Sequence, residues 1–143
     1  MSFVNTVDII GDNALMDSII ERTITEIADN MTTRIGNNAF SYCSNLTTAD
    51  FPAVTNIDMN AFRSCSKLTA LILRSEMMVN LNLTTALSST PIASGTGYIY
   101  VPRALVDSYK AATNWSTYAN QFRALEDYTV DGTTTGELDP NKI

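Results

Sequence analysis

The sequence predicts an α/β solenoid, a short stack of coils that each add one strand to a parallel sheet. The main observation is an internal repeat. Residues 35–51 align with residues 57–73 at an offset of 22, and Ala, Phe, Cys, Ser, Leu and Thr recur in register. The second observation is a content of 45% hydrophobic and 17% charged residues over 143 positions, which is typical of one globular domain.

The repeat length indicates the kind of coil. A period of roughly 20 to 29 residues is that of leucine-rich repeats, with one short strand and one tighter turn per coil. Residues 47–51 and 69–73 have apolar side chains at alternate positions, as half-buried strands require. An earlier strand lies one period before them, and a fourth precedes Pro102. We therefore expect a parallel sheet built from four segments: Thr25–Ala28, Thr47–Phe51, Thr69–Leu73 and Tyr98–Val101.

Two matched pairs of side chains are expected to stack between coils. Phe40 and Phe62 should form neighbouring layers of the core. Cys43 and Cys65 also occupy equivalent positions, so adjacent coils should bring them within about 5 Å. That spacing allows a disulfide, but a buried pair of free thiols is the preferred interpretation for a product of a reducing cytoplasm.

Both ends of the stack are predicted to carry helices. The first helix begins at Asp12 as the N-cap, ends near Arg22, and presents one apolar face: Leu15, Met16, Ile19 and Ile20. Pro102 opens a second helix, in which Leu105, Tyr109 and Ala112 share a face. A further short helix should follow through Trp115, Tyr118, Phe122 and Leu125. Such helices would cap the open ends of a stack.

The remaining segments lie outside the repeat. Residues 74–96 are predicted to form a degenerate coil with a long loop and scattered anchors: Met77, Met78, Leu81, Leu83 and Leu87. The chain is divided into an N-terminal arm at 1–11, the repeat domain with its helical caps at 12–126, and an acidic tail at 127–143. Residues 4–10 have no evident repeat partner in the chain and the tail has few apolar anchors, so we expect the ends to dock in a homo-oligomer or larger assembly.

The repeat motif resembles a known family. Ile-Gly-x-x-Ala-Phe-x-x-Cys-x-x-Leu at 35–46, and less closely at 57–68, resembles the BspA-like, Treponema-type leucine-rich repeat. Asp58 stands where the first copy has Gly36, so the resemblance does not determine the backbone geometry of that turn. Residues 90–102 and 106–115 resemble the closing segment of such repeats. The resemblance covers about residues 23–126 and implies a solenoid with a binding surface, as on bacterial adhesins and other cell-surface proteins.

Two departures from that family point to a particular setting. The start of the chain lacks the basic and apolar regions of a signal peptide, and the coils are few. Together with the ending 127–139, this is similar to versions among phage and prophage structural proteins of gut bacteria. We therefore expect a protein made in the bacterial cytoplasm and carried in the virion, as a tail-associated attachment protein. The alternative is a bacterial adhesin at the cell surface.

The residues that carry chemistry are few. The chain has no His, which removes Ser-His-Asp and Cys-His arrangements and most zinc sites. Asp107 and Glu126–Asp127 are interpreted as solvated acids. The net charge is −6 and no basic cluster occurs, which disfavours nucleic acid. We expect no enzyme, no catalytic, cofactor-binding or metal-binding residues, and no membrane insertion. The expected partners are other protein subunits and a host cell-surface protein or glycan.

Overall fold

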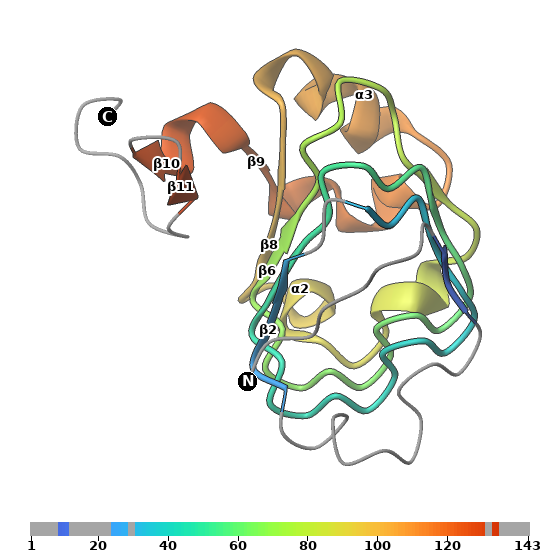
Figure 1. The fold of residues 1–143 in the computed structure, drawn as a ribbon. Helices are drawn as coiled ribbons and strands as arrows, with labels where there is room; N and C mark the ends of the chain where they lie inside the picture. The colour runs from blue at the N-terminus through green and yellow to red at the C-terminus, as the bar shows by residue number, and fades with distance from the viewer. Residues whose placement is uncertain (1–8, 12–23, 29–30, 131–132, 135–143) are drawn as a thin grey trace.

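The computed structural model describes residues 9–11, 24–28, 31–130 and 133–134. Over these residues the chain follows successive turns of similar path, with one parallel sheet on each of two sides (Figure 1). This is a solenoid-like α/β arrangement. The helix predicted at 12–22 lies outside the described residues.

The larger sheet is parallel throughout and has five strands. Their order is β2 (Glu26–Ala28), β4 (Thr48–Asp50), β6 (Ala70–Ile72), β8 (Tyr98–Val101) and β9 (Phe122–Ala124). Glu26 pairs with Thr48, and Thr48 pairs with Ala70, so paired residues of the first three strands are 22 residues apart, as in the sequence repeat. Ala70 then pairs with Tyr98 of β8. The predicted four-segment parallel sheet is confirmed.

A second parallel sheet, not expected from the sequence, adds another strand to each coil. Its order is β1 (Ile9–Ile10), β3 (Arg34–Ile35), β5 (Asn56–Ile57) and β7 (Asn80–Leu81). Ile10 pairs with Ile35, so the expectation that residues 4–10 lack a partner in the chain is wrong for this strand. The reason is that two-residue strands are too short to produce an alternating pattern, and only β3 and β5 are related by the 22-residue offset.

The core fills the space between the two sheets. One inward position of the five-stranded sheet is aligned across all strands as Ile27, Ala49, Leu71, Ile99 and Phe122, and each of these side chains is buried. Phe40 and Phe62 are both fully buried, and their rings stack with centroids 5.4 Å apart. The prediction that they form neighbouring core layers is confirmed.

The tight turns between the sheets repeat in their backbone geometry. Asn38 and Asn60 both have φ of 59°, and Tyr42 and Ser64 both have φ of 62°, so each copy of the turn passes through the left-handed region twice. Backbone bonds then join the copies, as where the Phe40 N–H donates to the Ala61 carbonyl at 2.8 Å. Neither Gly36 nor its counterpart Asp58 has a positive φ, so the position does not require glycine and Asp58 fits the same turn.

The degenerate coil contains more regular structure than was predicted. It carries β7, the 3₁₀ helix η1 (Thr84–Leu87) and α2 (Pro91–Ser94). Thr90 caps α2 by accepting from the Ala93 N–H at 3.3 Å. Gly97 follows in close contact, because a Cβ there would lie 2.9 Å from the Ile92 nitrogen and 3.0 Å from the Thr69 Cα.

The expected anchors of this coil are only partly correct. Leu81 and Leu87 are buried, but Met77, Met78 and Leu83 are exposed. The coil instead packs through a different set of small and branched side chains: Val79, Ala86 and Ile92. Met77 and Met78 fall in the stretch where the spacing between paired strands widens to 24 residues, from Asn56 to Asn80, so they have no counterpart in the preceding coil.

The C-terminal segment departs from the predicted pair of helices. It forms η2 (Arg103–Leu105), α3 (Val106–Ala111) and the 3₁₀ helix η3 (Trp115–Gln121), and then returns to the sheet as β9. Phe122 and Leu125 are therefore not in the helix that was expected. Phe122 pairs with Ile99, and this register places its ring in the core, where it stacks on Tyr109 at 5.3 Å.

Side chains of this segment hydrogen-bond to backbone groups of the last coil. The Trp115 indole N–H donates to the Val79 carbonyl at 2.8 Å, and the Val79 N–H donates to the Tyr109 hydroxyl at 2.8 Å. The Asn114 amide donates to the Leu81 carbonyl at 2.7 Å. These bonds satisfy backbone groups that a further coil would otherwise pair.

After β9 the chain forms η4 (Leu125–Tyr128), which we call the C-terminal strap, and then β10 (Thr129–Val130) and β11 (Thr133–Thr134). β10 and β11 pair with each other in antiparallel fashion beside the main body (Figure 1). The expected docking of the tail also concerns residues 131–132 and 135–143, which lie outside the described residues.

Candidate binding surface

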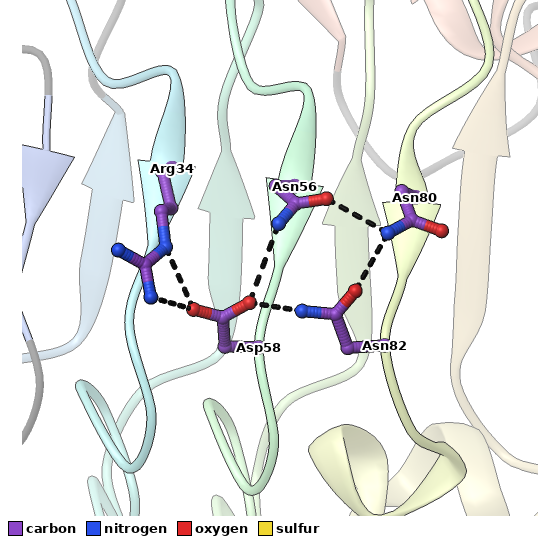
Figure 2. Close-up of polar contacts among 5 residues, drawn as sticks. All are labelled: Arg34, Asn56, Asp58, Asn80 and Asn82. Carbon is purple, nitrogen blue, oxygen red and sulfur yellow. Dashed lines mark hydrogen bonds and ion pairs between the residues drawn. The ribbon is translucent and has the colours of Figure 1, made fainter.

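A row of polar side chains crosses the outer side of the four-stranded sheet (Figure 2). We call it the polar ladder and define it by five residues: Arg34, Asn56, Asp58, Asn80 and Asn82. Arg34 on β3, Asn56 on β5 and Asn80 on β7 are partners in register. Asp58 and Asn82 each follow two residues later in their coils.

The strand pattern determines which way these residues face. Ile35, Ile57 and Leu81 are the buried residues of β3, β5 and β7. Successive side chains of a strand point to opposite sides, so the residues directly before and after these three lie on the outer side. The same periodicity that builds the core therefore aligns the polar ladder.

Asp58 is the centre of the ladder. Its side chain is only 4% exposed, and Arg34 approaches Oδ2 with Nε at 2.8 Å and with Nη2 at 2.5 Å. Oδ1 accepts from the amide groups of Asn56, at 3.4 Å, and of Asn82. A buried carboxylate is strongly unfavourable without such compensation, so this contact set is what allows an acid at this depth.

The asparagines continue the network toward the end of the stack. The Asn80 amide donates to Asn56 Oδ1 at 2.9 Å and to Asn82 Oδ1 at 2.6 Å. Each amide orientation is thus determined by its neighbours. Arg34, Asn80 and Asn82 are nevertheless exposed, so a partner can reach side chains that are already ordered. Binding to ordered groups loses less conformational entropy than binding to free ones.

The outer side of the five-stranded sheet is different in character. Ala70, Ile72 and Tyr100 point outward there and are still buried, because Leu125 and Tyr128 of the C-terminal strap pack against them. The rings of Tyr100 and Tyr128 meet edge to face at 4.9 Å. The apolar part of this sheet face is thus covered by the chain itself.

Arg103 contacts the two acidic residues of the C-terminal strap. Its backbone N–H donates to Glu126 Oε1 at 2.9 Å, and its guanidinium forms an ion pair with Asp127. Glu126 and Asp127 were interpreted from the sequence as solvated acids; Glu126 is exposed and Asp127 partly exposed, and both also contact Arg103. Asp107, the third such acid, is exposed in the first turn of α3.

Burial under the strap makes Tyr100 a probe of pH-dependent stability. Desolvation raises the pKa of Tyr100 to about 12, with smaller contributions from Tyr128 and Tyr98, which raise it, and Arg123, which lowers it. In the unfolded chain a tyrosine has a pKa near 10. As pH rises from about 10 to 12, the unfolded state therefore loses this proton first, binds fewer protons than the folded state, and the free energy of unfolding falls.

We expect Tyr100→Phe to weaken that decline, measured by urea unfolding at a series of alkaline pH values. Some decline should persist, because burial also raises the pKa of Tyr109 and of Tyr118. An unchanged slope in the variant would contradict the assignment to Tyr100.

The cysteines and aromatic residues singled out by the sequence are structural. Cys43 and Cys65 are buried free thiols, in accord with the preferred interpretation over a disulfide. The Cys65 thiol donates to the Phe40 carbonyl at 3.0 Å. Trp115 and Tyr118 are buried, as expected for core residues.

The polar ladder was missed by the sequence reasoning, although a signal for it existed. Arg34 and Asn56, like Gly36 and Asp58, are separated by the repeat offset of 22. Asp58 was noted only as a departure from glycine. Its role depends on Asn82, which lies in the degenerate coil, where the 24-residue spacing hides the correspondence.

None of the helices in the part of the chain that the structure describes is long and apolar enough to cross a membrane. In the same part of the chain, His, Cys, Asp and Glu side chains form no group of three or more that could hold a metal ion.

Comparison with known families gives one match. The family model described as BspA type leucine rich repeat region, with 6 copies, matches residues 1–92. The match includes the first strand, β1, and ends at residue 92 within α2, just inside the segment 90–102 that resembles a closing segment. No curated protein matches the chain. Because the family model covers more than half of the 143 residues, the chain belongs to the BspA-type leucine-rich repeat family.

Proposed function

We propose that this protein is a non-enzymatic binding module that uses the polar ladder to contact the polar surface of a partner. The observation that carries the proposal is the ladder itself, an ordered row of amide and guanidinium groups on the outer side of a sheet (Figure 2). The apolar part of the other sheet face is covered by the C-terminal strap and so is less available. Membership of a repeat family of interaction and surface modules supports the same function.

Two biological settings follow from the sequence. The family match supports the bacterial cell-surface adhesin setting. The phage virion or tail-associated setting rests on the resemblance of the small number of coils and of residues 127–139 to phage structural proteins. In both settings the partner class is the same, a host cell-surface protein or glycan. Assembly with other subunits, including copies of this chain, remains part of the proposal.

The proposal also gives the C-terminal segment the role of closing the stack. Hydrogen bonds from Asn114 and Trp115, and one from Tyr118 to the Thr84 carbonyl at 2.5 Å, support it. A closed end prevents further coils or other chains from pairing with the last coil.

The test uses the fluorescently labelled chain and a panel of intact bacterial and animal cells, so that partner cells of both settings are present, with binding measured by flow cytometry. The variant Asn80→Ala/Asn82→Ala removes two exposed ladder amides, and Ser66→Ala/Lys67→Ala, at exposed positions of a turn, is the matched control. Each lost hydrogen bond is worth about 0.5–1.5 kcal/mol, so we expect about tenfold weaker binding for the ladder variant and no change for the control.

Protease and periodate treatment of the cells then distinguishes a protein partner from a glycan partner. Equal losses in the two variants, or no binding to any cell in the panel, would contradict the proposed use of the ladder.

A further inference from the structure

We infer that a depression between α2 and η3 binds a neutral, hydroxyl-rich small molecule, namely a single sugar ring. The depression has a volume of about 210 Å³. Its lining comes from two short segments: Ile92, Ala93, Ser94 and Gly95 on one side, and Thr117, Tyr118, Asn120 and Gln121 on the other. These elements contribute no residue to the polar ladder, so the two sites are separate.

The charge of the lining restricts the ligand. All of its side chains are neutral, since it includes no Asp, Glu, Lys or Arg. A phosphate or carboxylate would lose its hydration on entry without gaining an opposite charge, and a cation would do the same. The ligand class is therefore neutral.

The polar groups of the lining restrict it further. Hydroxyl groups of Ser94 and Thr117 and amide groups of Asn120 and Gln121 can both donate and accept hydrogen bonds, as sugar hydroxyls can. The exposed Ala93 side chain provides a small apolar surface beside them, whereas the Ile92 and Tyr118 side chains of the lining are almost fully buried. A sugar ring has the same combination, since its hydroxyl groups surround apolar C–H faces.

Parts of the lining are held in place before any ligand binds. The Gln121 amide donates to the Gly97 carbonyl at 2.8 Å, and the Tyr118 hydroxyl donates to the Thr84 carbonyl at 2.5 Å. Gly95 ends α2 in the left-handed conformation, with φ of 95°, which fixes the other wall. A site that is largely formed in advance is what small-molecule recognition requires.

Size determines how much of a ligand can enter. Pockets for drug-sized ligands enclose about 300–1,000 Å³, so a depression of about 210 Å³ suits one ring and not a nucleotide or an oligosaccharide. Few atoms are then in contact, and weak binding follows. We expect dissociation constants of about 1–10 mM, which suits attachment through many copies more than tight capture of one molecule.

The test is an NMR titration of the uniformly ¹⁵N-labelled full chain with glucose, galactose, mannose and N-acetylglucosamine separately, and with glucuronate as the charged comparison. The expected result is a saturable shift of the Asn120 and Gln121 side-chain amide signals with at least one neutral sugar. Glucuronate should bind at least tenfold more weakly than that sugar.

Two variants locate the site. Ala93→Phe places a ring in the depression from an exposed position, and Ser116→Phe places the same ring on η3 at an exposed position outside the lining. We expect at least a tenfold loss of affinity in the first and none in the second. Should Ala93→Phe fail to fold, Asn120→Ala provides the same comparison with a smaller expected loss.

The inference is overturned if no neutral sugar moves these signals at tens of millimolar, or if Ala93→Phe and Asn120→Ala both bind like the parent. The ladder variant Asn80→Ala/Asn82→Ala should retain sugar binding here. If the depression binds no sugar, the proposal that the polar ladder binds cells is therefore unaffected. If the ladder does not bind cells, the inference of sugar binding is likewise unaffected.

Discussion

Replacing Phe62 with alanine is expected to lower the free energy of unfolding by about 3–5 kcal/mol, and the same change at Phe40 should cost a similar amount. The ring of Phe62 packs in a cluster with those of Phe40, at 5.4 Å, and Phe51, at 6.3 Å, and the latter two are 5.9 Å apart. Truncation removes this apolar contact and leaves a cavity between two coils. Backbone bonds hold the coils at a set spacing, so the stack has little freedom to close that cavity.

Thermal or urea unfolding measures the loss, and Met77→Ala is the control. Met77 is 77% exposed, so its truncation should change stability by no more than about 0.5 kcal/mol. A loss below about 1 kcal/mol at both phenylalanines would mean that the coils do not share one packed core.

The internal repeat explains why much of the core could be predicted. An offset of 22 residues places Phe40 against Phe62 and Thr48 opposite Ala70, and both relations are present in the structure. In a stack of coils, equivalent positions of neighbouring copies must be adjacent in space. One sequence comparison therefore predicts strand direction, register and core layers together.

The errors lie where the repeat gives no information. Met77 and Met78 were expected to be anchors because they are apolar, but both are exposed. They fall in an insertion that has no equivalent in the other copies of the repeat, so the repeat could not indicate where their side chains lie. Phe122 was expected in a helix because 115, 118, 122 and 125 have helical spacing. The chain instead takes a 3₁₀ helix and then a strand, because pairing with β8 places Phe122 beside Ile99 in the core. Pairing with the neighbouring strand here outweighs the helical spacing of the local sequence.

The candidate binding surface was predictable only in part. The repeat could have aligned Arg34 with Asn56, but no pattern shows that Asp58 is buried. Its burial depends on the neighbouring coil, where the asparagines at 80 and 82 are reached through a longer insertion. Polar networks of this kind depend on side-chain geometry across coils, which one coil's sequence does not contain.

Removing Arg34, the charge partner of Asp58, should therefore lower the free energy of unfolding more than truncating an exposed side chain usually does. We expect Arg34→Met to lower the free energy of unfolding by about 1.5–3 kcal/mol, since the carboxylate, with 4% of its side chain exposed, keeps only amide donors. Water can enter where the guanidinium stood, because the Arg34 side chain is 46% exposed, and this limits the loss. Arg63→Met, at an exposed arginine of a turn, should change stability little.

A double-mutant cycle with Asp58→Gly separates the buried charge from other effects of losing Arg34. Glycine is a suitable replacement because Gly36 occupies the equivalent position of the preceding copy, also without a positive φ. Once the carboxylate is absent, Arg34→Met no longer leaves a charge without its partner. The double variant should then be at least about 1 kcal/mol more stable than the sum of the two single changes implies. Additive losses would mean that Arg34 does not hold the Asp58 carboxylate, and the ladder would lose the ordering on which its proposed role in binding depends.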